Sequence, residues 1–328
     1  MKKNIAVITG GDSSEEVISV KSATLIMTSI DTDKYNVYLV HIKNKKWGVQ
    51  LNGNASEINI DKNDFSFQLN NSKISFDAAY LIIHGPPAEN GKLQAYLDMM
   101  RIPYVGPEVM QASLTFNKEV TKQYLGTSGV NSSIAVLLRK NEEIDIHAIS
   151  QKIGFPCFVK PNEAGSSFGV TKVYKEDQLQ DSIKKALTED ETVLIEKFIK
   201  GTEVTCGVFR LKNEIHVLPV TEIVSTKDFF DYEAKYTPGA ADEIIPARIS
   251  PELTRECQEL TKNIYRELNL TGFSRIDYII QNNHFYMLEV NTIPGMSPES
   301  IVPKMLRAGG YDIKAVITGM IDEVISGI

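Results

Sequence analysis

Three oxygen-bearing side chains near the end of the chain form the pattern that most directly suggests chemistry. Asp277 lies in one apolar run, and Glu289 and Asn291 lie two residues apart in the next. Residues two apart on a strand point to the same side, so Asp277 can lie opposite them if the runs pair as a hairpin through residues 281–283. Two carboxylates and an amide oxygen suit Mg²⁺, which keeps coordination sites for water and substrate phosphates. A solvated polar face is the alternative, but charges within apolar strands are costly unless paired or metal-bound, so we predict a metal site.

A second group of residues could bind a phosphate or an oxyanion. Arg275 precedes Asp277 by two positions and can donate two parallel hydrogen bonds to such a group. Residues 160–169, Lys-Pro-Asn-Glu-Ala-Gly-Ser-Ser-Phe-Gly, form a loop whose backbone N–H groups could contact phosphate oxygens, with Lys160 as a point charge. The loop is not a P-loop, because no Gly-Lys-Ser/Thr closes it. From this segment alone, a plain polar hairpin remains an equal alternative.

Two further segments follow predicted strands, at the edge where an open α/β sheet binds ligands. The first, residues 10–15, reads Gly-Gly-Asp-Ser-Ser-Glu, and the second contains His84. Neither belongs to a G-x-G-x-x-G fingerprint with an acid about 20 residues later, which argues against a dinucleotide-dependent oxidoreductase. Taken alone, the first segment is a glycine turn with a serine helix cap, and a lone histidine is more often structural. Residues 231–246 form a loop with two tyrosines that could act as a lid.

The elements that must position these groups change character along the chain. Before residue 118, strands are expected at 5–8, 35–42 and 78–83, with helices at 19–29 and 92–100. This alternation predicts an open parallel α/β sheet. The polar stretch 52–75 is expected to be a surface excursion between strands.

After residue 118, short strands dominate, which favours an α+β architecture with returning hairpins. The expected strands are 134–138, 157–160, 193–196, 204–211, 216–223, 275–280 and 285–290, and the expected helices are 176–187 and 251–268.

Composition excludes several classes of protein. The chain has 328 residues and a formal net charge of −7, which argues against nucleic-acid binding, since that needs a basic face. No apolar stretch approaches the roughly 20 residues that span a bilayer, and the N-terminal residues do not predict a signal peptide. The three widely spaced cysteines fit neither a disulfide framework nor a zinc site, so we expect reduced thiols in a cytoplasmic protein.

Taken together, these segments resemble the D-alanine–D-alanine ligases of the ATP-grasp superfamily over essentially the whole chain. The segments that carry the resemblance are, in order, 10–15 with Ser19, 84–94, 103–106, 117–118, 159–161, 165–169, 195–197, 201–203, 231–236, 275–277 and 289–296. The resemblance implies an N-terminal Rossmann-like domain at 1–118, followed by an ATP-grasp fold of two α+β subdomains at 119–205 and 206–328.

The resemblance also implies which residues would bind the nucleotide and the metal. Two lysines would hold the ATP phosphates, a glutamate and the backbone after it would contact adenine, and a second glutamate would contact the ribose. In chain order these residues are Lys118, Lys160, Glu196, Lys197, Ile199 and Glu203. The metal ligands would be Asp277, Glu289 and Asn291, holding two Mg²⁺ or Mn²⁺ ions that bridge the phosphates.

A further set of residues would bind the amino acids. Glu15 would hold the ammonium group of the first D-alanine and be linked through Ser166 to Tyr236 of the closing loop. His84 would lie near the same amino acid. The remaining roles implied are closure over the phosphates for Lys235, stabilisation of the tetrahedral intermediate for Arg275 and the Gly295 N–H, and positioning of the second carboxylate for Ser300.

The reaction implied is ATP-dependent ligation of two D-alanines through an acyl phosphate, for synthesis of a peptidoglycan precursor, by a cytoplasmic homodimer. Two alternatives stay open: a ligase of the same superfamily with D-serine or D-lactate as acceptor, and a non-catalytic nucleotide-binding module. Tyr236 goes with an amine acceptor in the family. The loop at 88–95 departs from the usual family pattern at Ala88, Asn90 and Ala95, and it would be strained if Ala88 took a positive φ.

Overall fold

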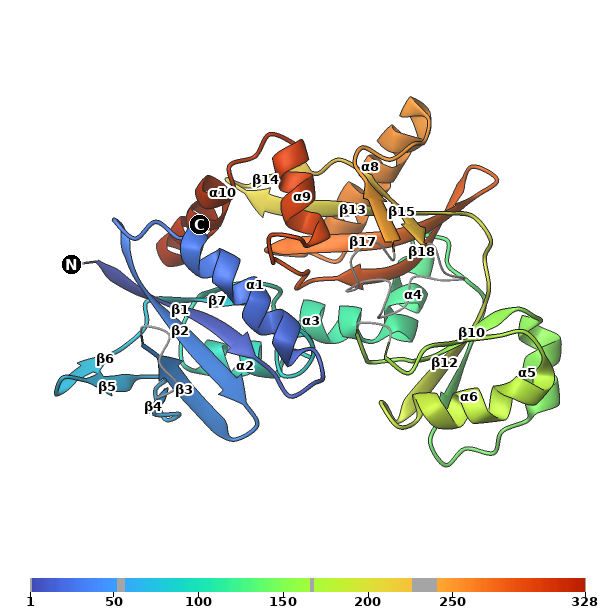
Figure 1. The fold of residues 1–328 in the computed structure, drawn as a ribbon, viewed down its shortest axis with the longest axis horizontal. Helices are drawn as coiled ribbons and strands as arrows, with labels where there is room; N and C mark the ends of the chain where they lie inside the picture. The colour runs from blue at the N-terminus through green and yellow to red at the C-terminus, as the bar shows by residue number, and fades with distance from the viewer. Residues whose placement is uncertain (1, 52–56, 166–167, 226–240, 328) are drawn as a thin grey trace.

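Three large β-sheets organise the protein in the computed structural model, which describes residues 2–51, 57–165, 168–225 and 241–327 (Figure 1). The N-terminal sheet lies at one end of the long axis, and a four-stranded central sheet lies at the other end. The C-terminal sheet lies between them, so that residues from all three regions can meet near the middle of the molecule.

The parallel strands of the N-terminal sheet confirm the predicted open α/β arrangement, and two further strands pair antiparallel at one edge of this sheet. Its strands are β1 (Lys3–Gly10), β2 (Tyr35–Lys43), β3 (Lys46–Gln50), β4 (Glu57–Asn59), β7 (Ala78–Leu81) and β8 (Tyr104–Val105), in the order β4-β3-β2-β1-β7-β8. Strand β1 pairs in parallel with both β2 and β7. Ile5, Ala6, Val7 and Ile8 are all 0% exposed, because helices and loops cover both faces of a parallel sheet. The helices of this region are α1 (Glu16–Ser29), α2 (Lys92–Met99) and α3 (Val109–Phe116).

The expected surface excursion at 52–75 is wrong for its described part. This segment contains β4 and a small hairpin of β5 (Phe67–Leu69) and β6 (Ser72–Ile74). Phe65 and Phe67 are 0% and 1% exposed and pack with Phe76 at ring distances of 5.4 and 5.7 Å. The polar residues of the segment are mostly exposed, whereas its buried aromatic residues belong to the same apolar core as the N-terminal sheet.

The central sheet is antiparallel, in the order β11-β10-β12-β9, as expected for α+β structure. Its strands are β9 (Ala135–Arg139), β10 (Cys157–Pro161), β11 (Thr171–Val173) and β12 (Thr192–Lys197). Two amphipathic helices, α5 (Ile146–Ile153) and α6 (Leu179–Ala186), bury their apolar residues against one face, and the short helix η1 (Glu176–Gln178) precedes α6. Helix α4 (Lys118–Gly126) enters this region and begins at Asn117, whose side chain caps the Val120 N–H.

The C-terminal sheet carries the predicted hairpin with its metal-type residues. Its path is β16-β15-β13-β17-β18, with β14 also paired to β13. The strands are β13 (Thr202–Leu211), β14 (Glu214–Val217), β15 (Thr221–Ser225), β16 (Ala241–Ile244), β17 (Phe273–Gln281) and β18 (His284–Asn291). The single strand expected at 216–223 is wrong: the chain leaves β14 after Val217 and re-enters the sheet as β15, because Pro219 cannot donate a ladder hydrogen bond.

The last helices join the two ends of the chain. Helix α8 (Pro251–Glu267) packs on the C-terminal sheet, and α9 (Ile301–Ala308) and α10 (Ile313–Ser326) follow β18. Helix α10 contacts α1 and β7 of the N-terminal sheet, and its buried residues Ile317 and Ile321 belong to the same apolar core as Ile5 (Figure 1). Each such fully buried side chain contributes about 1.5–3 kcal/mol. No described helix combines the length and the apolar character needed to cross a membrane.

The loop after β7 is not strained at Ala88. The positive φ angles in this loop belong to Gly85 (75°) and Gly91 (79°), and Ala88 is buried and outside the left-handed region. Since glycine adopts positive φ without steric cost, the departures at Ala88 and Asn90 leave the backbone of the loop relaxed.

Candidate active site

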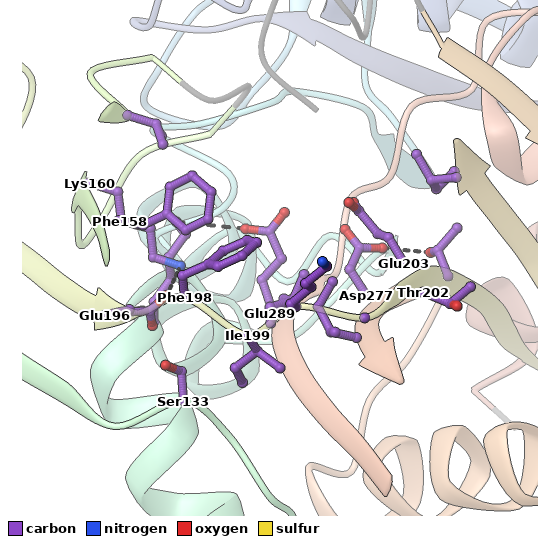
Figure 2. A pocket seen from close by; sticks show the side chains of 18 of the residues that line it. Ser133, Phe158, Lys160, Glu196, Phe198, Ile199, Thr202, Glu203, Asp277 and Glu289 are labelled. Carbon is purple, nitrogen blue, oxygen red and sulfur yellow. Dashed lines mark hydrogen bonds and ion pairs between the residues drawn. The ribbon is translucent and has the colours of Figure 1, made fainter. Parts of the chain in front are cut away.

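A cavity of about 510 Å³ lies between the central sheet and the C-terminal sheet (Figure 2). It is lined by residues from α4, β10, β12, β13, β15, β17 and β18. Of the residues expected to bind nucleotide or metal, it contains Lys118, Lys160, Glu196, Lys197, Ile199, Glu203, Asp277 and Glu289, together with Arg275. Residues separated by up to 171 positions in the sequence therefore share one chamber of nucleotide size.

One end of the cavity combines flat apolar walls with a charged edge. Phe158 lies on β10 and Phe198 directly follows β12, with ring centroids 5.9 Å apart. Beside them, Lys160 on β10 pairs with Glu196 on β12, with Nζ and Oε2 2.6 Å apart (Figure 2). Antiparallel pairing of β10 with β12 brings these side chains together. Aromatic walls and one carboxylate acceptor suit a purine base that offers an amino donor.

Lys122, which the sequence analysis did not single out, is buried behind this edge. Its ammonium group is in ion-pair contact with Glu196 Oε1, and its side chain is 4% exposed. It lies four residues after Lys118 on α4, so both lysines project from the same helix face. That i, i+4 spacing is the sequence signal that could have indicated a role for Lys122.

The opposite end of the cavity holds the carboxylates of the β17–β18 hairpin. Asp277 is paired directly with Glu289, as the sequence predicted, and Arg275 is paired with Asn291. Arg275 donates to both oxygens of Asp277 at 2.9 Å, in the bidentate geometry of a strong ion pair. Thr205 donates to Asp277 at 2.5 Å, and the Asn291 amide N–H donates to it at 3.2 Å. The hairpin therefore holds the Asp277 carboxylate in a fixed orientation.

The donor set of this hairpin fits Mg²⁺. It consists of two carboxylates and the amide oxygen of Asn291, whose NH₂ group is already used to orient Asp277. The described residues contain no cluster of three or more His, Cys, Asp or Glu side chains that could enclose a metal. This is the arrangement expected for Mg²⁺ that is bound by one or two carboxylates and completes its octahedron with substrate phosphates and water.

Lys118 connects the hairpin with the Gly/Ser loop. Its ammonium group lies 4.0 Å from Glu289 Oε2 and donates to the Ala164 carbonyl at 2.6 Å. Its side chain is 10% exposed, so it is a cation directed into the cavity from the first residue of α4. A lysine in this place can neutralise an anionic ligand held between the loop and the carboxylates.

A second group of acidic residues lies beside the Gly/Ser loop. The Glu15 carboxylate packs so closely against Gly165 that a Cβ on this glycine would lie 2.4 Å from Oε2. Glu89, which we had not assigned a role, accepts from the Gly85 N–H at 2.7 Å. Burial and the nearby Glu15 charge raise the pKa of Glu89 to about 8. A carboxylate beside a glycine loop and next to the phosphate-type residues can bind an ammonium group.

His84 lies at the junction between the N-terminal sheet and the last loop of the site. It is 6% exposed, and its Nε2 lies 3.4 Å from the Ser22 hydroxyl of α1. The same hydroxyl accepts from the Met296 N–H at 3.0 Å, which ties α1 to the loop containing Gly295. A Cβ on Gly295 would lie 2.9 Å from the Ser300 hydroxyl, so these two predicted residues are neighbours.

The burial of His84 gives a testable pH dependence of stability. Desolvation, aided by the Arg275 charge, lowers the pKa of His84 to about 4. Between pH 6.5 and 4 the unfolded chain binds a proton that the native state does not, so native stability falls as the pH falls. At pH 5 this loss is about 2 kcal/mol relative to pH 7. We expect the His84→Gln variant to lack that component in urea unfolding at the two pH values. Equal declines in the variant and the parent would show that His84 titrates normally.

Three of the predicted site residues, Ser166, Lys235 and Tyr236, lie outside the described residues. The others fall into two neighbouring groups: those that line the nucleotide-sized cavity, and those around Glu15, His84 and Gly295 that are reached from the N-terminal sheet. Lys118, Gly165 and Glu289 border both the large cavity and a smaller one that also contains Glu89 and Asn291, and they connect the groups.

An ATP-sized chamber between two antiparallel α+β sheets, beside an open α/β sheet, defines the class: an ATP-grasp enzyme. Family models agree with this architecture. The D-ala D-ala ligase N-terminus model matches residues 4–107, and the D-ala D-ala ligase C-terminus model matches residues 129–322. The chain belongs to the D-alanine–D-alanine ligase family, a family of ATP-dependent ligases.

Relatives and solved structures resemble the chain over nearly its full length. The D-alanine–D-alanine ligase of Bacteroides fragilis is 49% identical over 98% of this chain and 99% of its own. That of Azobacteroides pseudotrichonymphae is 50% identical over 98% and 100%. Among solved structures, D-alanyl-alanine synthetase A from Vibrio cholerae has a TM-score of 0.89 at 26% identity, covering 100% and 99% of the two chains. The VanG D-Ala:D-Ser ligase from Enterococcus faecalis has a TM-score of 0.86 at 30% identity, covering 99% and 100%. The Bacillus anthracis ligase complexed with ATP has a TM-score of 0.75 at 27% identity, covering 99% and 96%.

Proposed function

We propose that this protein joins two D-alanine molecules to D-alanyl-D-alanine at the expense of ATP. The observation that carries the proposal is the single chamber in which a base-type edge (Glu196 with Phe158 and Phe198) faces a phosphate-type edge (Asp277 with Glu289), next to the Glu15 carboxylate. The relatives at about 50% identity over 98% of the chain bear the name of this activity.

In the first step, the carboxylate of one D-alanine attacks the γ-phosphate of ATP, which gives an acyl phosphate and ADP. Lys118 and Lys160 reduce the charge of the phosphates, and Glu15 holds the ammonium group of the attacking amino acid. Glu196 with the backbone near Lys197 and Ile199 contacts adenine. Glu203, which lines the same cavity, contacts the ribose.

In the second step, the amine of the other D-alanine attacks the acyl carbon and phosphate leaves. The tetrahedral intermediate carries an oxyanion, which Arg275 and the Gly295 N–H stabilise, while Ser300 holds the carboxylate of the attacking amino acid. His84 lies near the first D-alanine and remains neutral at physiological pH, because its pKa is lowered to about 4. Ser166, Lys235 and Tyr236 complete the proposed set as residues that link to Glu15 and exclude water from the acyl phosphate.

Two Mg²⁺ or Mn²⁺ ions, held by Asp277, Glu289 and Asn291, belong to this proposal. When bound, such ions neutralise phosphate oxygens and orient the γ-phosphate for in-line transfer. The chain's own contribution is a carboxylate pair already aligned by cross-strand pairing and by Arg275, Thr205 and Asn291.

An ATP-grasp ligase with D-serine or D-lactate as acceptor is less well supported. The similarity to the D-Ala:D-Ser ligase is 30% identity, compared with about 50% for the D-alanine–D-alanine ligases. A non-catalytic nucleotide-binding module is disfavoured, because the metal-type carboxylates, Arg275 and both phosphate-type lysines are in place.

The organisation and location of the protein follow from the same proposal. We propose a cytoplasmic homodimer that supplies a peptidoglycan precursor and binds neither nucleic acid nor membrane. We also propose the division into 1–118, 119–205 and 206–328, since each range contains one large sheet apart from the first residues of β13.

The experiment that tests the proposal measures phosphate release from ATP and Mg²⁺ and identifies the products by mass. D-alanine is compared with L-alanine and with mixtures of D-alanine and D-serine or D-lactate. D-alanyl-D-alanine from D-alanine alone is the expected product. A product formed only from a mixed pair would show that D-serine or D-lactate, not D-alanine, is the acceptor. No turnover despite ATP binding would refute the ligase activity.

Gly165→Ala is expected to raise the KM for D-alanine about tenfold, because the added Cβ would overlap the Glu15 carboxylate at 2.4 Å and displace it. Steady-state kinetics with D-alanine varied at saturating ATP measure the effect. Gly126→Ala is the matched control, since a Cβ there meets nothing within 4 Å. An unchanged KM for D-alanine in the Gly165 variant would refute the proposed binding of the first D-alanine by Glu15.

A further inference from the structure

Lys122 is a buried cation next to the nucleotide cavity but not part of its described lining. Its side chain is 4% exposed and that of Glu196 is 5% exposed. Lysine is almost never buried to this degree without a partner. Among the described residues, Lys122 Nζ and Glu196 Oε1 make no hydrogen bond besides their ion-pair contact.

Two lysines share the Glu196 carboxylate from different sides. Lys122 contacts Oε1 from α4, and Lys160 lies 2.6 Å from Oε2 on the cavity side. With all three groups ionised the net charge is one positive, and Lys160 is the lysine of the three that lines the cavity. Without Lys122, Glu196 and Lys160 would form a neutral pair, and less positive potential would remain for an anionic ligand.

Burial and the neighbouring Lys160 and Lys118 ammonium groups lower the pKa of Lys122 below its ordinary value. The Glu119 and Glu289 carboxylates oppose this lowering of the pKa, and Glu196 is the acidic group in direct contact with the Lys122 side chain. A charged side chain at position 122 is therefore costly to bury. A lysine that only filled space here could be replaced by methionine, which has nearly the same volume and no charge to desolvate.

We propose that Lys122 is a positioning residue for nucleotide selection, which acts through Glu196. The inference rests on the proposed binding of ATP in this cavity. With Oε1 held from behind, the Glu196 carboxylate keeps one orientation toward the base and acts only as an acceptor. It therefore accepts from the 6-amino group of adenine and disfavours the 6-carbonyl group of hypoxanthine.

The test is nucleotide binding to the full-length Lys122→Met protein, measured calorimetrically for ATP and for ITP without D-alanine. We expect the Kd for ATP to rise about tenfold, as for the loss of one hydrogen bond to a charged group, and the preference for ATP over ITP to fall by a similar factor. The KM for D-alanine and the kcat at saturating ATP should change by less than about threefold. Lys184→Met, at a side chain 67% exposed on α6, is the matched control and should behave as the parent.

The double variant Lys122→Met/Glu196→Gln keeps the test decisive if the single variant does not fold. In the single variant the buried Glu196 charge is paired with Lys160 alone, whereas the double variant removes that charge as well, so this protein should be the more stable of the two. Its glutamine amide can donate to the carbonyl of hypoxanthine, so it should bind ATP and ITP with nearly equal affinity.

A parent-like preference for ATP over ITP in a folded Lys122→Met protein, or in the double variant, would overturn the proposal. A uniform fall in thermal stability without any change in that preference would likewise assign Lys122 a purely structural role. Failure of the parent to make a dipeptide while it still binds ATP would refute the proposed ligase reaction only, because the nucleotide preference is read from binding.

Discussion

Substituting Arg275 by methionine is expected to lower kcat for dipeptide formation by about 100- to 1,000-fold, the usual effect of removing one oxyanion donor. In the structure the guanidinium lines the cavity and is held by two hydrogen bonds of 2.9 Å to Asp277. It is therefore oriented before any substrate binds and loses little entropy when charge develops on the acyl oxygen.

The Arg275 prediction separates catalysis from binding. We expect the Kd for ATP to change much less than kcat, because the charge that Arg275 stabilises exists only in the intermediate. Arg275→Lys keeps the charge but not the bidentate geometry, and it should recover only part of the rate. Arg255→Met, at a side chain 68% exposed on α8, is the control for loss of a surface charge. A kcat of the Arg275→Met protein within tenfold of the parent would show that Arg275 does not stabilise the oxyanion.

Replacing Glu289 by glutamine is expected to reduce kcat/KM for ATP at least about 100-fold and to raise the Mg²⁺ concentration needed for half-maximal rate. The amide has nearly the same shape but no charge, and neutral oxygen ligands bind Mg²⁺ more weakly than carboxylates. Glu289 lies directly across from Asp277, and its Oε2 lies 4.0 Å from the Lys118 ammonium group. Loss of the Glu289 charge therefore also removes a negative group next to Lys118.

Activity as a function of Mg²⁺ concentration measures this effect. Chelation by EDTA should abolish phosphate release in the parent, and added Mg²⁺ or Mn²⁺ should restore it. Excess Mg²⁺ should rescue the Glu289→Gln protein in part. Glu259→Gln, on the exposed face of α8, controls for loss of a carboxylate elsewhere. Full activity of the Glu289 variant, or EDTA-resistant turnover, would contradict the metal site.

The hairpin that carries Asp277 and Glu289 could be predicted because its information is local. Alternating apolar residues define β17 and β18, and Asn282 and Asn283 adopt φ angles of 51° and 62°, which asparagine tolerates in a tight turn. Two-residue periodicity places Glu289 and Asn291 on one side of β18, but the exact pairing of Asp277 with Glu289 depends on a register shift between Asp277 and Tyr278, which no local pattern predicted. The parallel strands of the N-terminal sheet were equally predictable, since buried runs such as residues 5–8 alternate with helical patterns.

The segment 52–75 shows where local information fails. Most of its residues are polar and typical of a loop, yet two phenylalanines are buried. Phe65 packs against Phe76 and Trp47. Phe67 packs against Phe76 and Tyr38. Composition averages over a window, whereas burial depends on the few residues that meet an apolar surface formed elsewhere in the chain.

The amino-acid sequence by itself determined most of the longer strands, the turn of the β17–β18 hairpin and the residue types that can bind phosphate and metal, because these depend on neighbours a few positions apart. Tertiary structure alone decided that α10 completes the N-terminal core and that Ser22 of α1 holds the Met296 N–H. It also decided that Lys122 meets Glu196, 74 positions later in the sequence. Such contacts arise when elements pack on shared apolar faces, and no local pattern states which faces will meet.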